Sequence, residues 1–385
     1  MSDIRTYLDW NASAPIYPEV VEAMSEALLD GGNASSVHHE GRIAHGRIEA
    51  ARDQVAQLIN ANPRDIVFTS GGSEANSLAL SGLAANGTID RIFISAVEHP
   101  SVMAFATLEG VQVSIIPVDQ YGIVKLDALE ACLTKAVAAN EKILVSIMWA
   151  NNETGVIQPI EDIVKMTHAH KCLMHCDAIQ ALGKIPVDFT ASGVDLMSLS
   201  AHKIGGPQGV GALVVQPTVV LAPMLKGGGQ ELSRRAGTEN LGGIVGFGLA
   251  AELSHRNDDD TEIASLRNQL ESEIRKIRSD VVIFGEDQKR LPNTTCAAVC
   301  GTTAEALLIV LDLAGIAVSS GSACSSGKVA NSHVLNAMGV EDAVAKAAIR
   351  ISCGRTTSTQ DIEKFLNAWL KAVGTTAKQN ATAAA

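Results

Sequence analysis

The regular alternation of short apolar runs with amphipathic stretches, from about residue 15 to 250, is the feature that most constrains this chain. Such alternation is typical of βαβ units arranged around a mainly parallel sheet. The apolar runs predicted to be strands are 66–69, 91–95, 143–147 and 173–176. The last three lack the polar alternation of a strand with one face in water, so we expect helices on both faces of the sheet.

The length of 385 residues favours two domains. Helical spacing predicts helices at 18–29, 41–58 and 160–170, and a charged helix at 261–278 that directly follows an acidic run. We therefore expect a domain boundary near residue 256. The prediction is a large domain over 15–256, a small domain over 1–14 and 257–374, and a disordered tail of small and polar residues over 375–385.

Composition excludes several classes of protein. Hydrophobic residues make up 46% of the chain and charged residues 19%, as in a compact soluble protein. The net charge is -12 and the sequence has no Lys or Arg cluster suited to a phosphate backbone, so we expect no nucleic-acid partner. The N-terminus has no apolar signal core, and the most apolar stretch, 306–318, contains Asp312. We expect a cytoplasmic protein that does not enter a membrane.

Lys203 follows the apolar segment 194–200 and precedes a break in the chain made by two glycines and a proline. A lysine at the end of a strand can extend into a cavity, where burial or a nearby charge lowers its pKa and allows it to attack a carbonyl. Asp177 ends another apolar strand, 26 residues earlier. A carboxylate in that position can pair with the pyridine nitrogen of pyridoxal phosphate, although a lone Asp at a strand end is more often a helix cap.

The segment 69–76 runs from a strand through Gly71 and Gly72 into a predicted helix. Free backbone N–H groups at a helix N-terminus bind a phosphate, and the Ser73 hydroxyl adds a donor. The segment lacks the lysine of a P-loop and the glycine spacing of a dinucleotide fingerprint, which argues against a nucleotide.

Cys324 lies in a run of small polar residues, 319–327, that predicts an exposed loop. An exposed thiol can ionise and act as a nucleophile, whereas the other six cysteines are mostly in apolar segments and are expected to be inert core thiols, Cys296, Cys300 and Cys353 among them. A second cluster of possible ligands comprises His168, His170, Cys172, His175 and Cys176. Their close spacing points them in different directions, so we expect no metal site.

Taken together, the motifs resemble the class V aminotransferase group of pyridoxal phosphate enzymes, and within it the NifS/IscS-type cysteine desulfurases. The likeness extends from residue 7 to about residue 365. It rests on the segments 32–36, 97–101, 151–155, 235–240 and 319–324, together with the segments around Asp177 and Lys203. The resemblance implies an α/β fold of the fold type I class, with a large domain built on a mainly parallel seven-stranded sheet and a smaller α+β domain.

The resemblance also implies a role for each matching residue. It implies that Lys203 forms the Schiff base with pyridoxal 5'-phosphate, that Asp177 pairs with the pyridine nitrogen, and that His99 stacks on the ring and moves protons. Other positions match residues that hold the ring oxygen (Gln180, Asn152), the phosphate (Gly72, Ser73, Ser200, His202), the partner subunit's phosphate (Thr238) and the substrate carboxylate (Arg350, Asn152).

The implied reaction converts L-cysteine to L-alanine and leaves the sulfur on Cys324 as a persulfide. The implied partners are a second copy of the chain and a sulfur-acceptor protein such as an iron–sulfur scaffold, which places the activity in the synthesis of iron–sulfur clusters or other sulfur-containing cofactors. Two alternatives stay open: another reaction on the same cofactor, such as that of a selenocysteine lyase or other class V lyase or aminotransferase, and a binding module that keeps the fold without the cofactor.

Overall fold

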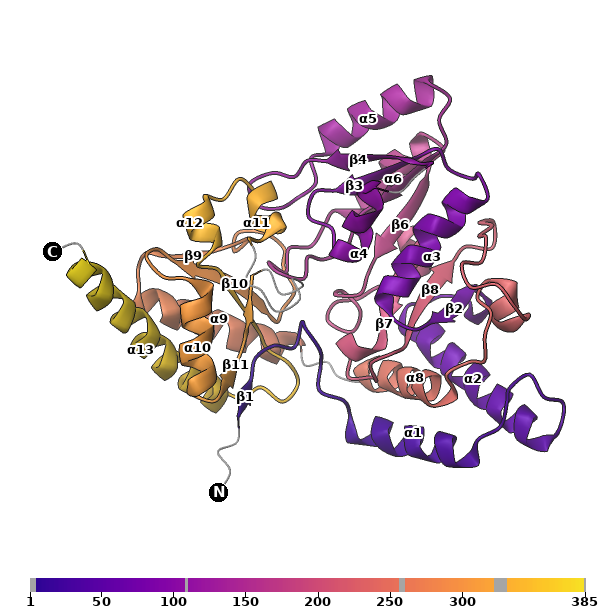
Figure 1. Ribbon diagram of the computed structural model, residues 1–385, viewed down its shortest axis with the longest axis horizontal. Coiled ribbons are helices and arrows are strands. Elements are labelled where there is room, and N and C mark those ends of the chain that lie inside the picture. Colours follow the sequence, from indigo (N-terminus) through magenta and orange to yellow (C-terminus); the bar gives the residue numbers. More distant parts are fainter. Residues whose placement is uncertain (1–4, 108–109, 256–259, 322–330, 384–385) are drawn as a thin grey trace.

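A computed structural model describes residues 5–107, 110–255, 260–321 and 331–383. Figure 1 shows a larger part, which holds the main sheet, and a smaller part formed mostly by the end of the chain. The predicted boundary near residue 256 lies in 256–259, outside the described residues. Within the described ranges, none of the helices combines the length and the apolar character that crossing a membrane requires.

The larger part is built on a seven-stranded sheet with the order β2-β8-β7-β6-β5-β3-β4. The strands are β2 (Ile66–Thr69), β3 (Arg91–Ser95), β4 (Gln112–Ile116), β5 (Ile143–Ser146), β6 (Leu173–Asp177), β7 (Leu196–Ser200) and β8 (Gly211–Val215). Strand β8 is antiparallel to both of its neighbours, and the other pairs are parallel. The mainly parallel seven-stranded sheet is therefore confirmed.

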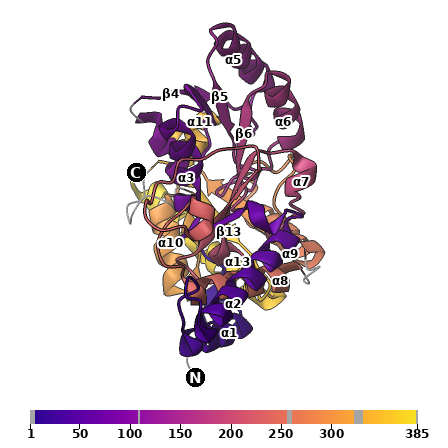
Figure 2. The same ribbon diagram turned by 90° about the vertical axis from the view of Figure 1, so that its right-hand side faces the viewer.

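Helices cover both faces of this sheet, as the apolar strands predicted. Alternate residues of the strands point to opposite faces. Val67 and Leu144 join the apolar cluster of α3 (Gly72–Ala85), whereas Phe68 and Val145 join a second cluster on the other face. That second cluster is completed by α2 (His39–Leu58), α5 (Leu126–Ala138), α6 (Ile160–Ala169), α7 (Phe189–Ser192) and α8 (Leu241–His255). Helix α1 (Pro18–Asp30) packs on α8 at the base of the molecule, as Figure 2 shows from the side.

The smaller part contains a four-stranded antiparallel sheet of β9 (Val281–Ile283), β10 (Thr294–Val299), β13 (Ile349–Ser352) and β12 (Ser319–Ser320). Its long helices are α9 (Asp260–Ile277), α10 (Ala304–Leu313) and α13 (Thr359–Ala383), and α11 (His333–Ala337) and α12 (Asp342–Ala345) are short. The N-terminal strand β1 (Thr6–Tyr7) pairs in parallel with β11 (Ile316–Ala317). The two ends of the chain thus build this part together (Figure 1).

Strand β13 carries one polar side chain between two apolar ones. Ile349 and Ile351 pack into the apolar cluster of the smaller part. Because side chains alternate along a strand, Arg350 points to the opposite face, toward the larger part. The same alternation divides β10, where Ala297 and Cys296 belong to different apolar clusters. The small sheet therefore presents one face to its own core and the other to the main domain.

Helix α13 runs from Thr359 to Ala383 and so extends into the segment 375–385. The prediction of a disordered tail there stays a prediction.

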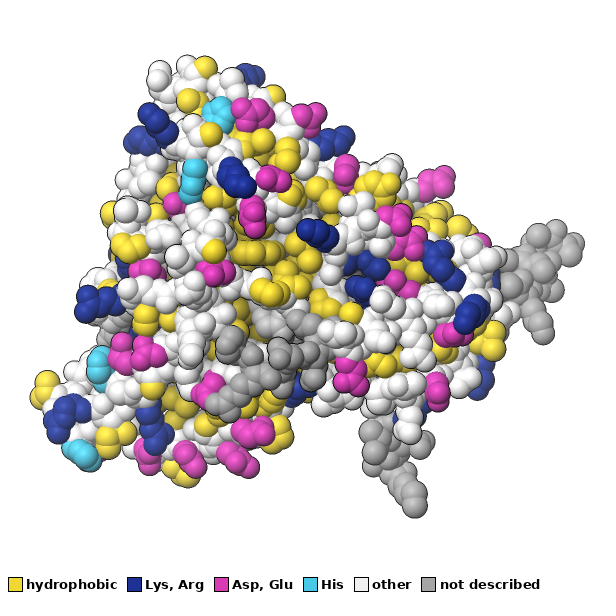
Figure 3. Space-filling model, turned by 180° about the vertical axis from the view of Figure 1, so that it is seen from behind, with side chains coloured by type: hydrophobic (Ala, Val, Ile, Leu, Met, Phe, Trp, Pro, Cys, Tyr) yellow, Lys and Arg dark blue, Asp and Glu magenta, His cyan; other side chains and the backbone are white. Residues whose placement is uncertain are grey.

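The surface mixes charges of both signs. On the face shown in Figure 3, acidic and basic side chains are interspersed with apolar ones. On that face the acidic side chains are spread over several regions.

A buried ion pair fixes the segment that follows the large sheet. Both carboxylate oxygens of Glu231 accept from the Arg52 guanidinium at 2.9 Å, and one also accepts from the Phe68 backbone N–H at 2.9 Å. The side chains are 10% and 2% exposed for Arg52 and Glu231. Glu231 adopts a φ of 48°, an uncommon conformation for a residue with a side chain, so these bonds offset a local strain.

We expect Glu231→Ala to lower the free energy of unfolding by about 3–5 kcal/mol, because it leaves the Arg52 charge buried without its partner. Urea denaturation followed by circular dichroism measures this change. The matched control is Glu49→Ala, which removes the half-exposed second partner of Arg52 and should cost about 0–1 kcal/mol. Equal losses in the two variants would contradict the interpretation.

Candidate active site

The predicted site residues come together because parallel strands end at the same edge of a sheet. Residues that follow β2, β3, β5, β6 and β7 line one cavity of about 250 Å³, and Arg350 reaches it from β13. Ten of the sequence-predicted residues line this cavity: Gly72, Ser73, His99, Asn152, Asp177, Gln180, Ser200, His202, Lys203 and Arg350.

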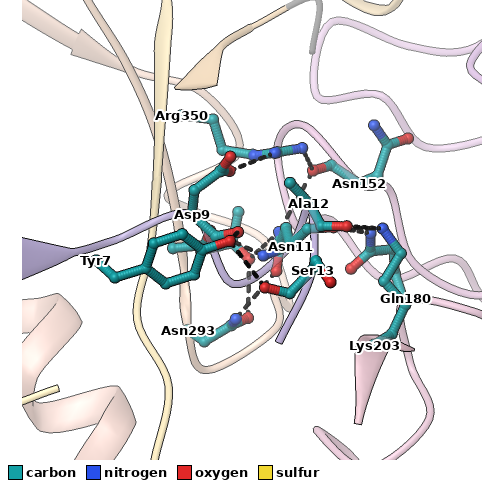
Figure 4. A network of polar contacts seen from close by, with 12 residues as sticks. Tyr7, Asp9, Asn11, Ala12, Ser13, Asn152, Gln180, Lys203, Asn293 and Arg350 are labelled. Carbon is teal, nitrogen blue, oxygen red and sulfur yellow. Dashed lines mark hydrogen bonds and ion pairs between the residues drawn. The ribbon is translucent and has the colours of Figure 1, made fainter. Parts of the chain in front are cut away.

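Lys203 ends the short 3-10 helix (Ala201–Lys203) that follows β7. Its Nζ donates to the backbone carbonyls of Asn11 and Ala12 at 2.6 and 2.9 Å, as Figure 4 shows. The N-terminal segment thus passes along the edge of the cavity and holds the amine at the cavity wall. Both of these acceptors are neutral carbonyl oxygens, and a competing ligand can replace such bonds.

Asp177, at the end of β6, is a buried carboxylate with two fixed bonds. Its Oδ1 accepts from the backbone N–H of Ile179 at 3.0 Å, and its Oδ2 accepts from the amide of Asn76 at 2.8 Å. The side chain is 5% exposed and lines the cavity. A charged acceptor therefore faces the cavity in one orientation.

His99 lies just before α4 (Pro100–Met103), and its Nδ1 is held by Ser101. The Ser101 N–H donates to Nδ1 at 3.1 Å, and the Ser101 hydroxyl lies 2.8 Å from the same nitrogen. Because Nδ1 accepts, the neutral ring carries its proton on Nε2. Burial lowers the pKa of His99, with Lys203 and His333 acting in the same direction and Asp177 opposing them. The ring is thus predominantly neutral near pH 7.

A phosphate-sized cradle lies at the N-terminus of α3. The first N–H groups of a helix have no intrahelical acceptor and attract an anion. A Cβ at Gly72 would lie 2.2 Å from the Ile179 side chain, so this position at the start of the helix has no room for a side chain. Ser200 and His202 border the same cavity, and burial, followed by Lys203 and Lys184, lowers the pKa of His202 to about 4. His202 therefore presents a neutral ring.

Arg350 lies at the opposite end of the cavity and is 1% exposed. Its guanidinium donates to Asp9 Oδ1 at 2.8 Å and to the backbone carbonyl of Asn152 at 2.9 Å (Figure 4). Within the described residues its Nε is buried with no hydrogen-bond partner. A buried donor left over in a wall of the cavity suits an anionic group of a ligand.

One predicted residue lies away from the cavity, and another falls outside the described residues. Thr238 is exposed on the segment that follows the buried Glu231, and does not border this site. Cys324 lies in 322–330, outside the described residues. Their assignments stay predictions.

Of the six remaining cysteines, four are buried as expected, Cys132 is partly buried against the apolar core of the large part, and Cys300 differs. Cys172, Cys176, Cys296 and Cys353 are buried, and burial raises the pKa of Cys172 to about 11 and that of Cys353 to about 12. Cys300 was predicted to be a core thiol, but it is exposed. The reason is that β10 ends at Val299 and the chain turns outward at this point.

The histidines of the cluster at 168–176 have separate partners. His168 contacts Asp195 and His170 contacts Glu130, both at 3.0 Å, whereas the buried His175 lies between Ser146 and Ser198. These side chains therefore serve as structural hydrogen-bonding groups.

These residues fit pyridoxal phosphate. The cavity has an amine in its wall, a fixed carboxylate, a glycine-lined helix N-terminus for a phosphate and an arginine with a spare donor.

The comparisons with known proteins agree with this site. The chain matches the family model described as Aminotransferase class-V over residues 6–365. A cysteine desulfurase of Sinorhizobium fredii is 44% identical over 369 residues, which cover 94% of this chain and 94% of that protein. The chain belongs to the cysteine desulfurase family of class-V aminotransferases.

Solved structures give the same family. A NifS-like protein from Rickettsia africae has a TM-score of 0.88 and 39% identity, and the match covers 96% of this chain and 99% of that one. A structure of SspA in complex with cysteine has a TM-score of 0.79 and 31% identity, covering 90% of this chain and 98% of that one. The predicted family and fold class are confirmed, and members of this family are pyridoxal phosphate enzymes.

Sequence reasoning did not single out Asn11, Asn76, Ser101 or Lys184. Asn76 and Ser101 lie inside motifs that the sequence analysis used, but their role depends on a bond between them, from Asn76 Nδ2 to Ser101 Oγ at 2.9 Å. Asn11 acts through its backbone carbonyl, which no side-chain motif reveals. Of these four residues, only Lys184 could have been found from the sequence: it follows Gln180 by four residues, the spacing that places two side chains on the same side of a helical turn.

We expect Ser101→Ala to raise the pKa of His99, because the hydroxyl donor to Nδ1 stabilises only the neutral ring. The charged and titratable neighbours Asp177, Lys203 and His333 are unchanged in this variant. NMR titration of the histidine ring protons measures the shift, with Ser25→Ala on the exposed face of α1 as the control. An unchanged or lower pKa would show that Ser101 does not set the protonation of this ring.

Proposed function

We propose that this chain is a pyridoxal phosphate-dependent cysteine desulfurase that converts L-cysteine to L-alanine and transfers the sulfur to Cys324. The observation that carries the proposal is the convergence of Lys203, Asp177, His99 and Arg350 on one cavity. Membership of the cysteine desulfurase family supports it, and so does the neighbour solved in complex with cysteine.

The cofactor end of the cavity supports the first part of the proposal. Lys203 would attach the aldehyde covalently, Asp177 would pair with the ring nitrogen, and the α3 N-terminus would hold the phosphate. When bound, pyridoxal phosphate supplies an electron sink that stabilises negative charge at the substrate Cα. Gln180 and Asn152 would bond the ring oxygen, and His99 would cover one face of the ring.

The substrate end supports the second part. Arg350 would bind the α-carboxylate of cysteine through its spare donor, in the geometry that favours a guanidinium over an ammonium. The Lys203 amine lies in the cavity wall and would take the α-proton of the substrate. The neutral His99 carries its exchangeable proton on Nε2 and is suited to returning a proton to the product.

Sulfur transfer completes the reaction. The Cys324 thiolate attacks the substrate sulfur, the bond between that sulfur and the substrate Cβ breaks, and the electron pair stays on the organic fragment, which is protonated to alanine. A persulfide remains on Cys324. We propose that a sulfur-acceptor protein, such as an iron–sulfur scaffold, then removes the outer sulfur.

A homodimer is part of the proposal. Thr238 is exposed in one protomer and does not border its own cavity, which suits a residue that completes the phosphate site of the partner subunit. The Arg52–Glu231 pair holds the preceding residues against the large domain. A fixed base for this segment would orient Thr238 for that contact.

We expect Lys203→Ala to abolish covalent attachment of the cofactor, because among the described residues Lys203 is the lysine that lines this cavity. The holoprotein should have an absorption band in the near-ultraviolet or visible region that borohydride fixes to the chain, and the variant should not. Lys165→Ala, on the exposed face of α6, is the control. Borohydride-stable cofactor in Lys203→Ala would refute the assignment, and a wild-type chain that binds no cofactor would favour the binding-module alternative.

We expect Cys324→Ala to lose at least about 100-fold in alanine formation from cysteine, since the nucleophile for the sulfur is gone. The variant should still bind the cofactor with the wild-type spectrum. Cys300→Ala is the matched control, because Cys300 is exposed and has no role in the proposal. Alanine formation that persists in Cys324→Ala would instead favour a lyase that needs no cysteine nucleophile.

A further inference from the structure

Lys184 is a lysine of the site region that the proposed reaction does not use. It lies in the tight turns of 178–185, where backbone N–H groups bond to carbonyls three and four residues earlier. This turn places Lys184 on the same side as Gln180, four residues before it. The Lys184 Nζ donates to the Gln180 Oε1 at 2.6 Å.

This bond fixes which end of the Gln180 amide faces which partner. Because Oε1 accepts from Lys184, the amide nitrogen lies on the other side, where it donates to the Asn11 carbonyl at 2.9 Å. The same carbonyl accepts from the Lys203 amine at 2.6 Å. A continuous chain of hydrogen bonds therefore runs from Lys184 through Gln180 and Asn11 to Lys203 (Figure 4 shows its last three members).

The geometry points to Lys184 as a positioning residue, which we propose holds the Gln180 amide with its N–H side toward the cavity and so toward the cofactor ring oxygen. This inference rests on the proposed cofactor. An amide turned by 180° would present its oxygen to the Asn11 carbonyl and to the ring oxygen, and two acceptors facing each other repel. Lys184 prevents this turn by occupying Oε1.

Lys184 can donate to Gln180 whether its amine is charged or neutral. Burial lowers the pKa of Lys184, with Lys203 and Arg350 acting in the same direction. An ammonium and a neutral amine both carry N–H groups, so the bond to Gln180 persists in either form.

A double-mutant cycle on the full-length protein tests the proposal. The variants are Lys184→Met, Gln180→Ala and the two combined, and the readout is the Kd for pyridoxal phosphate, measured by titration of apo-protein. We expect Lys184→Met to weaken binding about tenfold, the equivalent of one hydrogen bond. In the Gln180→Ala background the same change should weaken binding less than about twofold, because Lys184 acts through that amide.

Three further measurements separate positioning from a general effect on folding. The unfolding midpoint of the apo-protein should be unchanged or higher in Lys184→Met. Lys184→Arg keeps a donor, and the adjoining cavity of about 70 Å³ that Lys184 lines gives it room, so it should bind within about threefold of wild type. Lys165→Met is the exposed control and should match wild type.

The outcomes are distinct. A Lys184→Met protein that binds as tightly as wild type, losses that add fully in the cycle, or a folded Lys184→Arg that binds tenfold more weakly would each overturn the positioning role. Lys184→Arg and Gln180→Ala still decide the matter if Lys184→Met does not fold. Failure of the wild-type chain itself to bind pyridoxal phosphate would refute the proposed function, which is a different result.

Discussion

The common direction of the parallel strands is the constraint on which the site depends. The carboxyl ends of β2, β3, β5, β6 and β7 meet at one edge of the sheet, since β8 is the only antiparallel member of the seven. Each strand ends in a short polar segment, so a row of turns forms where the strands stop. The cavity is the space that these turns enclose with the face of the smaller sheet that carries Arg350.

The chemistry of the cavity depends on which hydrogen-bond partners its charged side chains have. Lys203 and Lys184 donate to neutral oxygens, and Arg350 divides its bonds between Asp9 and a backbone carbonyl. The Lys203 amine and the Arg350 guanidinium both line the cavity, which suits an anionic ligand. Asp177 stays available because neutral donors, and not cations, hold it.

The N-terminal segment links the two parts of the molecule through its backbone. Strand β1 pairs with β11 in the smaller part, and a few residues later the carbonyls of Asn11 and Ala12 accept from Lys203. The Asn11 side chain also bonds to Thr294 of β10 and to the Asn152 carbonyl. One short stretch thus joins the amine of the large domain to the sheet that carries Arg350.

The sequence by itself determined the strands at 66–69 and 91–95, the mainly parallel sheet and the residues that end each strand, because apolar runs and turn residues are local signals. It also determined the family, through motifs around Lys203 and Asp177. Only the tertiary structure decided that Asn76 joins Asp177 to Ser101, that Lys184 orients Gln180, and that Cys300 is exposed. The physical reason is that these features depend on how the chain folds in space, through contacts between residues of different turns or through the place where a strand ends. Such features leave no periodic pattern in the amino-acid sequence.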